Sequence, residues 1–232
     1  MAANEVKNQD TGLGDVEQVL TKTEQYIEQN QKSLSIIVGA IFFIILIFLG
    51  YKKFILGPKE KEARQQMFKA EQYFERDSFR LALHGDGNNL GFIDIVNDYG
   101  IIKSANLARY YAGICFLKIG DYQQAIDYLE DFDSGDKIVG SLALGAIGDA
   151  HMELANEKQA VSFYEKAAAR NKNEFTCPYF LLKAAQVYEK QQNYGKALKL
   201  LKKIKSEYPE SQEGRMVDKT IAVLEYKVQA KQ

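Results

Sequence analysis

Histidine, a common catalytic and metal-binding side chain, is rare in this sequence. Only two histidines occur, His84 and His151, and neither belongs to an H-E-x-x-H or H-x-x-E-H pair of the kind that binds zinc in hydrolases. The GDGNN stretch at 85–89 lacks the regular acidic spacing of a calcium loop and is better explained as a turn. Phosphate-cradling and G-x-S-x-G nucleophile motifs are absent from the sequence. We therefore expect no enzyme, no metal site, no cofactor and no small-molecule substrate.

Cysteine content and net charge exclude further classes of protein. Cys115 and Cys177 are too few for a disulfide scaffold or a zinc site, and each lies among apolar residues, as a buried small side chain does. Whether they are oxidised to one disulfide stays open, because a bridge depends on their separation in space. The formal net charge of −1 gives no electrostatic signature of nucleic-acid binding.

Small residues at a fixed spacing provide the strongest pattern in the sequence. Gly113 and Ala125, Gly148 and Ala160, and Ala185 and Ala197 are each twelve residues apart, and successive pairs are offset by 35 and 37 residues. Tetratricopeptide repeats need small residues at these points because the two helices of each hairpin cross closely there, and their period is near 34 residues. The sequence therefore predicts an all-α solenoid of tetratricopeptide repeats, a fold that serves protein binding.

The repeat register also selects a binding surface. In such a solenoid the first helix of each repeat lines the concave face. The residues predicted to form this protein-binding groove are Leu107, Tyr110, Ile114, Lys118, Asp149, Met152, Glu153, Tyr179, Gln186 and Glu189. The groove is apolar in the first repeat and polar, partly acidic, in the next two, which suits a partner helix or an extended segment. Alternatively, Leu107 and Ile114 belong to the core beneath the preceding unit. A clamp for C-terminal carboxylates is poorly supported, because an acidic repeat separates Lys118 from Lys190.

Partial units are predicted on both sides of the three repeats. Ala70 and Ala82 are again twelve residues apart, but a glycine-rich insertion and a short helix ending near Tyr99 follow them. After Pro209, one apolar stripe predicts a capping helix; it consists of Met216, Val217, Ile221, Leu224 and Val228.

The elements before the repeats predict a membrane protein. Residues 34–51 carry no charge, and as a helix they would be about 27 Å long, close to the thickness of a bilayer core. A buried core helix would rarely be apolar on every face, and a cleaved signal peptide would not follow an acidic segment of 33 residues. The predicted organisation is an acidic tail with an amphipathic helix (1–33), an anchor (34–51), a linker broken at Gly57-Pro58 (52–58), repeats with a degenerate first unit (59–209) and the capping helix (210–232).

The side of the membrane is left open by the flanking charges. Lys22 and Lys32 precede the anchor within about twenty residues. Six basic residues follow it: Lys52, Lys53, Lys59, Lys61, Arg64 and Lys69. The positive-inside rule alone would place the repeats in the cytoplasm, although long domains cross the membrane largely regardless of charge.

The arrangement resembles the YfgM family of ancillary subunits of the bacterial SecYEG translocon. The resemblance is best over residues 16–51, where Glu28, Asn30, Lys32 and Leu34 form an E-x-N-x-K-x-L sequence that leads into the anchor. It implies a single-pass protein of the bacterial inner membrane with its repeats in the periplasm. It also implies that the partners are the translocon and a membrane-anchored periplasmic chaperone or prolyl isomerase, which the protein would assist with emerging chains.

Overall fold

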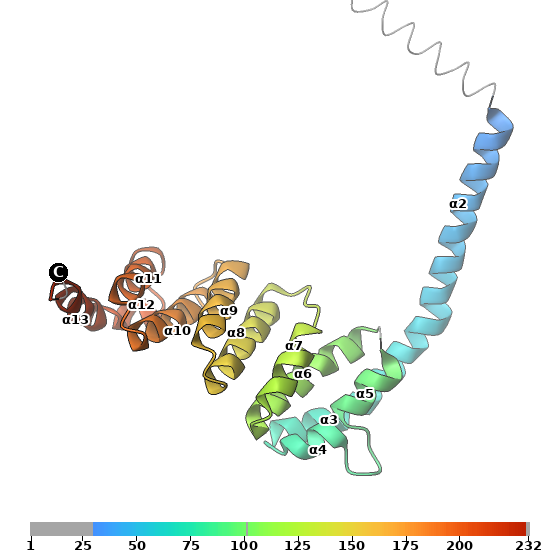
Figure 1. The fold of residues 1–232 in the computed structure, drawn as a ribbon. Coiled ribbons are helices and arrows are strands. Elements are labelled where there is room, and N and C mark those ends of the chain that lie inside the picture. The colour runs from blue at the N-terminus through green and yellow to red at the C-terminus, as the bar shows by residue number, and fades with distance from the viewer. Residues whose placement is uncertain (1–29, 101, 231–232) are drawn as a thin grey trace, which may run out of the picture. The chain divides into compact units, whose positions relative to one another are not determined.

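The described part of the chain, residues 30–100 and 102–230 of a computed structural model, contains helices as its only regular elements (Figure 1). The chain divides into two compact units, Met1–Pro58 and Lys59–Gln232. The amphipathic helix predicted within residues 1–33 lies almost wholly outside the described residues. The fold class predicted from the sequence is confirmed for the repeat unit, which is an all-α solenoid of helix pairs.

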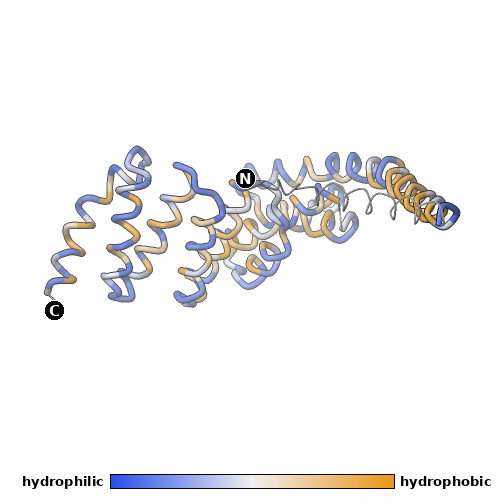
Figure 2. The backbone as a smooth tube through the Cα atoms, turned by 90° about the horizontal axis from the view of Figure 1, so that it is seen from above, coloured by the Kyte–Doolittle hydropathy of each residue, from blue (hydrophilic) through white to orange (hydrophobic). Residues whose placement is uncertain are grey.

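The first unit contains the helix α2 (Gln31–Tyr51), which includes the whole uncharged segment 34–51. None of its residues is buried, and apolar side chains such as Ile36 and Phe48 are 71% and 62% exposed. Figure 2 shows this helix as hydrophobic along most of its length, whereas the helices of the second unit alternate in hydropathy. One helix of the described chain is long and apolar enough to cross a membrane, and this helix contains the uncharged segment 34–51.

The helix break predicted at Gly57-Pro58 is wrong. Residues 52–58 are helical, with a π-helical turn η1 (Lys52–Leu56) followed directly by α3 (Gly57–Glu75). The amide of Gly57 donates a hydrogen bond to the carbonyl of Lys52, as the wider π turn allows. Pro58 lies in the first turn of α3, where a helix tolerates the missing N–H. The linker of the predicted organisation is therefore a helix.

The second unit contains helix pairs that follow the predicted repeat register. The pairs are α3 with α4 (Phe79–His84), α6 (Lys103–Ile119) with α7 (Tyr122–Glu130), α8 (Lys137–Glu153) with α9 (Glu157–Arg170), and α10 (Cys177–Lys190) with α11 (Tyr194–Glu207). An additional helix, α5 (Phe92–Tyr99), packs on α6 and follows the glycine-rich insertion. It ends where the sequence placed the end of a short helix.

The turn inside each pair has the same backbone geometry. One residue adopts a left-handed conformation, and the next residue is the N-cap of the second helix. The left-handed residues are Asp77, Gly120, Ala155 and Gln192, and the N-caps are Ser78, Asp121, Asn156 and Asn193. Short polar side chains suit an N-cap because their oxygen can accept a hydrogen bond from the first turn. The Asp121 carboxylate accepts one from the Gln124 amide, for example.

The small residues mark the closest approaches between the paired helices. A β-carbon on Gly113 would lie 2.5 Å from Leu129, and one on Gly148 would lie 2.6 Å from Tyr164. The partner alanines Ala125 and Ala160 are fully buried. These helix crossings therefore need the small side chains that the spacing indicated.

The core of the repeat unit consists of two clusters of buried residues, one over α3–α8 and the other over α9–α13. Cys115 lies in the first cluster and Cys177 in the second, and both are free. Burial raises the pKa of the Cys115 thiol to about 12, so this thiol stays protonated and packs as a small apolar side chain.

The glycine-rich insertion is organised around the carboxylate of Asp86. It accepts hydrogen bonds from the Tyr73 hydroxyl at 2.7 Å and from the backbone amides of Asn88 and Asn89 at 2.9 and 2.7 Å. The bonds from Tyr73 and Asn89, followed by that from the Asn88 amide, hold the pKa of this carboxyl well below its usual value. The insertion is thus a turn, as the sequence indicated, and the bond from Tyr73 joins it to α3.

The end of the chain contains two helices where the apolar stripe predicted one. These are α12 (Gln212–Met216) and α13 (Asp218–Gln229), and the helix breaks at Val217. Val217 and Leu224 are buried, whereas Met216 is 60% exposed. The break turns Val217 into the core and leaves Met216 outside, so Met216 does not belong to the packed stripe.

Candidate protein-binding groove

The first repeat contributes an apolar part to the predicted groove from helix α6. Leu107, Tyr110 and Ile114 are half-buried and pack against the first core cluster, whereas Lys118 at the end of the helix is exposed. The ring of Tyr110 lies 5.3 Å from the ring of Phe132 in the loop after α7, and burial raises the pKa of its hydroxyl. These side chains are therefore held by neighbours on one side and keep part of their surface in solvent.

Helices α3 and α5 contact another α6 residue, Tyr111. Its ring stacks on Phe92 of α5 at 5.1 Å and meets the edge of Phe74 of α3 at 5.0 Å. Leu107 and Ile114 stay half-exposed beside this aromatic cluster. Helices α3 and α5 thus fill the space over Tyr111 without burying Leu107 and Ile114.

The second and third repeats are joined by an ion pair that the sequence did not reveal. Lys183 of α10 donates a hydrogen bond at 2.6 Å to Asp149 of α8, and the Tyr164 hydroxyl donates to the same oxygen at 2.6 Å. Burial opposes the charge on Lys183, but the hydrogen bond and the attraction of Asp149 outweigh it and raise the lysine pKa. Asp149 is therefore a neutralised structural contact between the first helices of two repeats.

This network also orders aromatic side chains of the groove. The Lys183 ammonium lies 5.2 Å from the ring centroid of Tyr179 and 5.5 Å from that of Tyr164. Burial and the bond to Asp149 raise the pKa of Tyr164, so its hydroxyl stays protonated as a donor. Tyr179, which is 42% exposed, is thus presented to solvent beside a cation.

The other charged groove residues are less acidic as a group than the sequence suggested. Glu189 accepts a hydrogen bond from Lys227 of α13 at 2.9 Å, and Lys190 pairs with Glu157 of α9 at 2.9 Å. Glu153 is exposed. Asp149 and Glu189 are both paired with lysines. Of the three acidic residues predicted for the groove, only Glu153 therefore forms no ion pair within the described helices. Because Lys190 is paired with Glu157, it is also less available to bind the C-terminal carboxylate of a partner.

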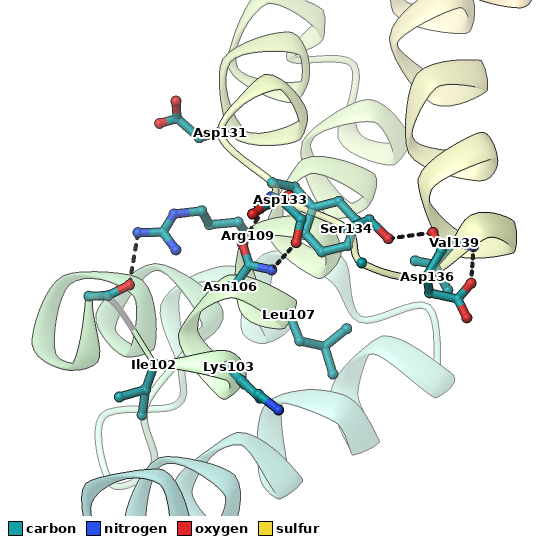
Figure 3. Close-up of a pocket in the computed structure, with 13 residues that line it drawn as sticks. Ile102, Lys103, Asn106, Leu107, Arg109, Asp131, Asp133, Ser134, Asp136 and Val139 are labelled. Carbon is teal, nitrogen blue, oxygen red and sulfur yellow. Dashed lines mark hydrogen bonds between the residues drawn. The ribbon is translucent and has the colours of Figure 1, made fainter. Parts of the chain in front are cut away.

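The hollows of the surface show which predicted residues lie together. Met152 and Gln186 line one hollow of about 250 Å³ with Tyr164 and Lys183. Leu107 lines a larger hollow of about 830 Å³, formed by the start of α6, the α7–α8 loop and the start of α8 (Figure 3). The predicted groove residues are therefore distributed over more than one hollow.

The larger hollow has a rim fixed by hydrogen bonds. The side-chain amide of Asn106 donates to the Asp133 carbonyl at 2.6 Å and accepts from the Asp133 amide at 3.0 Å. Arg109 donates to the carbonyl of Gly100 at 3.0 Å, and Asp136 caps α8 (Figure 3). The sequence did not single out Asn106, because its partner lies 27 residues away. The rim positions the α7–α8 loop beside the apolar side chain of Leu107.

The histidines have surroundings that packing explains. His151 stacks on Phe163 at 5.3 Å between ring centroids, and burial lowers its pKa. His84 is exposed at the end of α4. Among the described residues, no group of three or more histidine, cysteine or acidic side chains is placed to hold a metal ion.

Comparison with known families identifies the repeats. Residues 107–133 and 179–211 match the tetratricopeptide repeat family, and these stretches contain α6 with α7 and α10 with α11. No curated protein matches the chain. The chain thus contains tetratricopeptide repeats in these two stretches, a kind of repeat that mediates contacts between proteins, and it has one helix that is long and apolar enough to cross a membrane.

Proposed function

We propose that this protein is a membrane-anchored module that binds other proteins through the concave face of its repeats and has no catalytic role. The observation that carries the proposal is the partly exposed row Leu107, Tyr110 and Ile114 on α6, held in place by neighbouring side chains. Aromatic and aliphatic side chains that are already ordered lose little conformational freedom when a partner covers them. Tyr179, beside Lys183, extends this surface into the third repeat.

The occupant that suits this surface is an amphipathic helix or an extended, partly hydrophobic segment. The α6 side chains would cover its apolar positions. The polar side chains of the later repeats, Gln186 and Glu153 among them, would contact its solvated edge. The paired charges Asp149–Lys183 and Glu189–Lys227 add no net charge, so the apolar part would dominate recognition.

We further propose that the protein serves protein export at the bacterial inner membrane. The resemblance of residues 16–51 to the YfgM family and the apolar helix α2 support an accessory role at the SecYEG translocon, with periplasmic chaperones or prolyl isomerases as partners. The alternative is a cytoplasmic orientation, in which the repeats would tether another complex to the membrane. The six basic residues at 52–69 favour that alternative.

Pull-down of partners tests the binding surface. The double variant Tyr110→Ala with Met152→Ala should lose captured partners, because both side chains contribute partly exposed surface to the first helices of their repeats. Tyr226→Ala is a matched control, since this tyrosine is 74% exposed on α13, outside the groove. Undiminished capture by a double variant that melts like the wild type would exclude the groove as the binding surface.

Protease accessibility tests the orientation. In spheroplasts, protease added outside should cleave the repeat unit if it lies in the periplasm. Cleavage that occurs only after lysis would instead place the repeats in the cytoplasm and remove the basis for a periplasmic chaperone role.

A further inference from the structure

The second helices of the repeats form a surface whose charge changes in regular steps. Because successive repeats are offset by 35 and 37 residues, three exposed or half-exposed positions are equivalent in all three repeats. They are occupied by Asp127, Glu130 and Asp131 at α7, by Ser162, Glu165 and Lys166 on α9, and by Lys199, Lys202 and Lys203 on α11. Their formal charges are −3, 0 and +3. We call these nine positions the second-helix surface.

The acidic end of the second-helix surface has no basic neighbour in sequence. Residues 120–136 contain six acidic residues and no lysine or arginine. Within the described chain, Asp127, Glu130 and Asp131 form no salt bridge, and Asp127 accepts a hydrogen bond from the neutral Gln123 at 2.9 Å. No salt bridge therefore neutralises these carboxylates within the described chain.

The basic end has partners that solvent largely screens. Lys202 pairs with Glu225 at 2.6 Å and Lys203 with Glu207 at 4.0 Å, and all four side chains are at least 42% exposed. Pairs this exposed contribute little and exchange readily. Lys199 forms no salt bridge among the described residues. The lysines of α11 can therefore turn to an acidic surface on another molecule.

From this antisymmetric pattern we infer that the second-helix surface binds a second copy of the same chain in antiparallel orientation. A twofold axis through α9 places α7 of each copy against α11 of the other, so −3 faces +3 twice. The three α9 positions, whose formal charges sum to zero, face their own copies, and the adjacent Glu165 and Lys166 can pair across the axis. A parallel arrangement would place like charges together, whereas a uniformly charged partner would match one end and be repelled by the other.

This inference goes beyond the proposed function, because it uses the face of the repeats opposite the groove. The groove of each copy stays free for a partner. The membrane-anchored dimer would therefore present two equivalent binding surfaces.

Sedimentation of the full chain in detergent micelles tests the inference. At about 0.1 M salt a dimer should form, and at about 1 M salt it should weaken by about tenfold or more, because the screening length falls from about 10 Å to about 3 Å. A monomer at both salt concentrations would overturn the inference.

Charge reversal tests the orientation of the two copies. The variant Asp127→Lys with Glu130→Lys, and the variant Lys199→Glu with Lys202→Glu, should each be monomeric at about 0.1 M salt. An equal mixture should dimerise, because each contact then again joins opposite charges. Lys59→Glu with Lys61→Glu on α3 makes the same change in net charge as the Lys199→Glu/Lys202→Glu variant and should dimerise like the wild type. Circular dichroism confirms that each variant is folded.

Two results would contradict the antiparallel pairing. One is dimerisation of a single charge-reversed variant at wild-type strength. The other is failure of the mixture to restore the dimer. Zero-length carboxyl-to-amine crosslinking of isotopically mixed chains provides a further check: crosslinks between chains should join residues 127–131 to residues 199–203. If instead the wild type is monomeric and only the α11 variant loses binding to anionic vesicles, the basic end serves a membrane surface.

Discussion

At the scale of single residues, the left-handed residue in each repeat turn has the clearest effect on stability. The same conformation occurs at Gly120, where it is unstrained, and at Ala155 and Gln192, with φ of 58° and 56°. A β-carbon in this conformation approaches the following carbonyl oxygen, which costs about 1–2 kcal/mol per residue. Two of the three full repeats therefore carry a residue that their turn does not favour.

Ala155→Gly should accordingly stabilise the repeat unit. We expect the free energy of unfolding to rise by about 0.5–1 kcal/mol, because relief of the left-handed strain exceeds the added flexibility of the unfolded chain. A denaturant titration measures the change. Ala169→Gly is the matched control: it lies exposed in α9 and should lose about 0.5–1 kcal/mol. If both variants lose stability equally, the turn at Ala155 is not strained.

His151 should make the stability of the protein depend on pH. Burial lowers its pKa in the folded state below the ordinary value of 6.5, so protonation favours the unfolded state. Stability should therefore fall as the pH drops through 6.5 and continue to fall until the pH is below the folded pKa.

The variant His151→Phe isolates this effect. Its melting temperature should change less than that of the wild type between about pH 7.5 and about pH 5.5, because the stacking on Phe163 is kept and the titrating group is gone. Equal pH dependence in His151→Phe and the wild type would show that another group is responsible.

At the scale of the helices, each repeat depends on one close crossing between its two helices. The crossing of α8 with α9 leaves no room for a side chain at Gly148, since a β-carbon there would lie 2.6 Å from the Tyr164 ring. Tyr164 cannot move away freely, because its hydroxyl is bonded to Asp149. The crossing and the Asp149–Lys183 network are thus joined through one aromatic ring.

Gly148→Leu should therefore overpack the crossing and destabilise the repeat unit by about 1–3 kcal/mol. Thermal and denaturant unfolding measure the loss. Gly195→Ala is the control, because no atom lies within 4 Å of a β-carbon at this position in α11; it should be neutral or stabilising by up to about 1 kcal/mol. An unchanged unfolding curve for Gly148→Leu would contradict the close crossing.

For the whole molecule, the proposed membrane attachment rests on α2 within the described chain. Deletion of residues 34–51 should release the protein from membranes, because the described helices contain no second segment with the length and composition of a membrane span. Extraction of membranes at alkaline pH measures the attachment. Retention of the deleted protein in the pellet would show that another part of the chain holds it there.

The sequence by itself determined the all-α class, the repeat register and the candidate anchor, because each depends on local spacing. Pairs of small residues twelve apart specify a helix crossing, and an uncharged run of eighteen residues specifies the length and polarity of a spanning helix. It also placed Leu107, Tyr110 and Ile114 on one face of a first helix, where the structure has them half-exposed. The predicted helix break at Pro58 was wrong, because proline occurs both in the first turn of a helix and at a helix break, and the sequence alone does not distinguish the two.

Only the tertiary structure decided how the groove residues are partnered. The sequence placed Asp149 and Glu189 in the partly acidic part of the groove. In the structure Lys183, which is 34 residues away, neutralises Asp149, and Lys227 of α13 does the same for Glu189. Val217 turns inward and leaves Met216 exposed, although both belong to the same apolar stripe in sequence. Such contacts depend on which side chains neighbouring helices bring within 3–4 Å, and spacing along one helix does not contain that information.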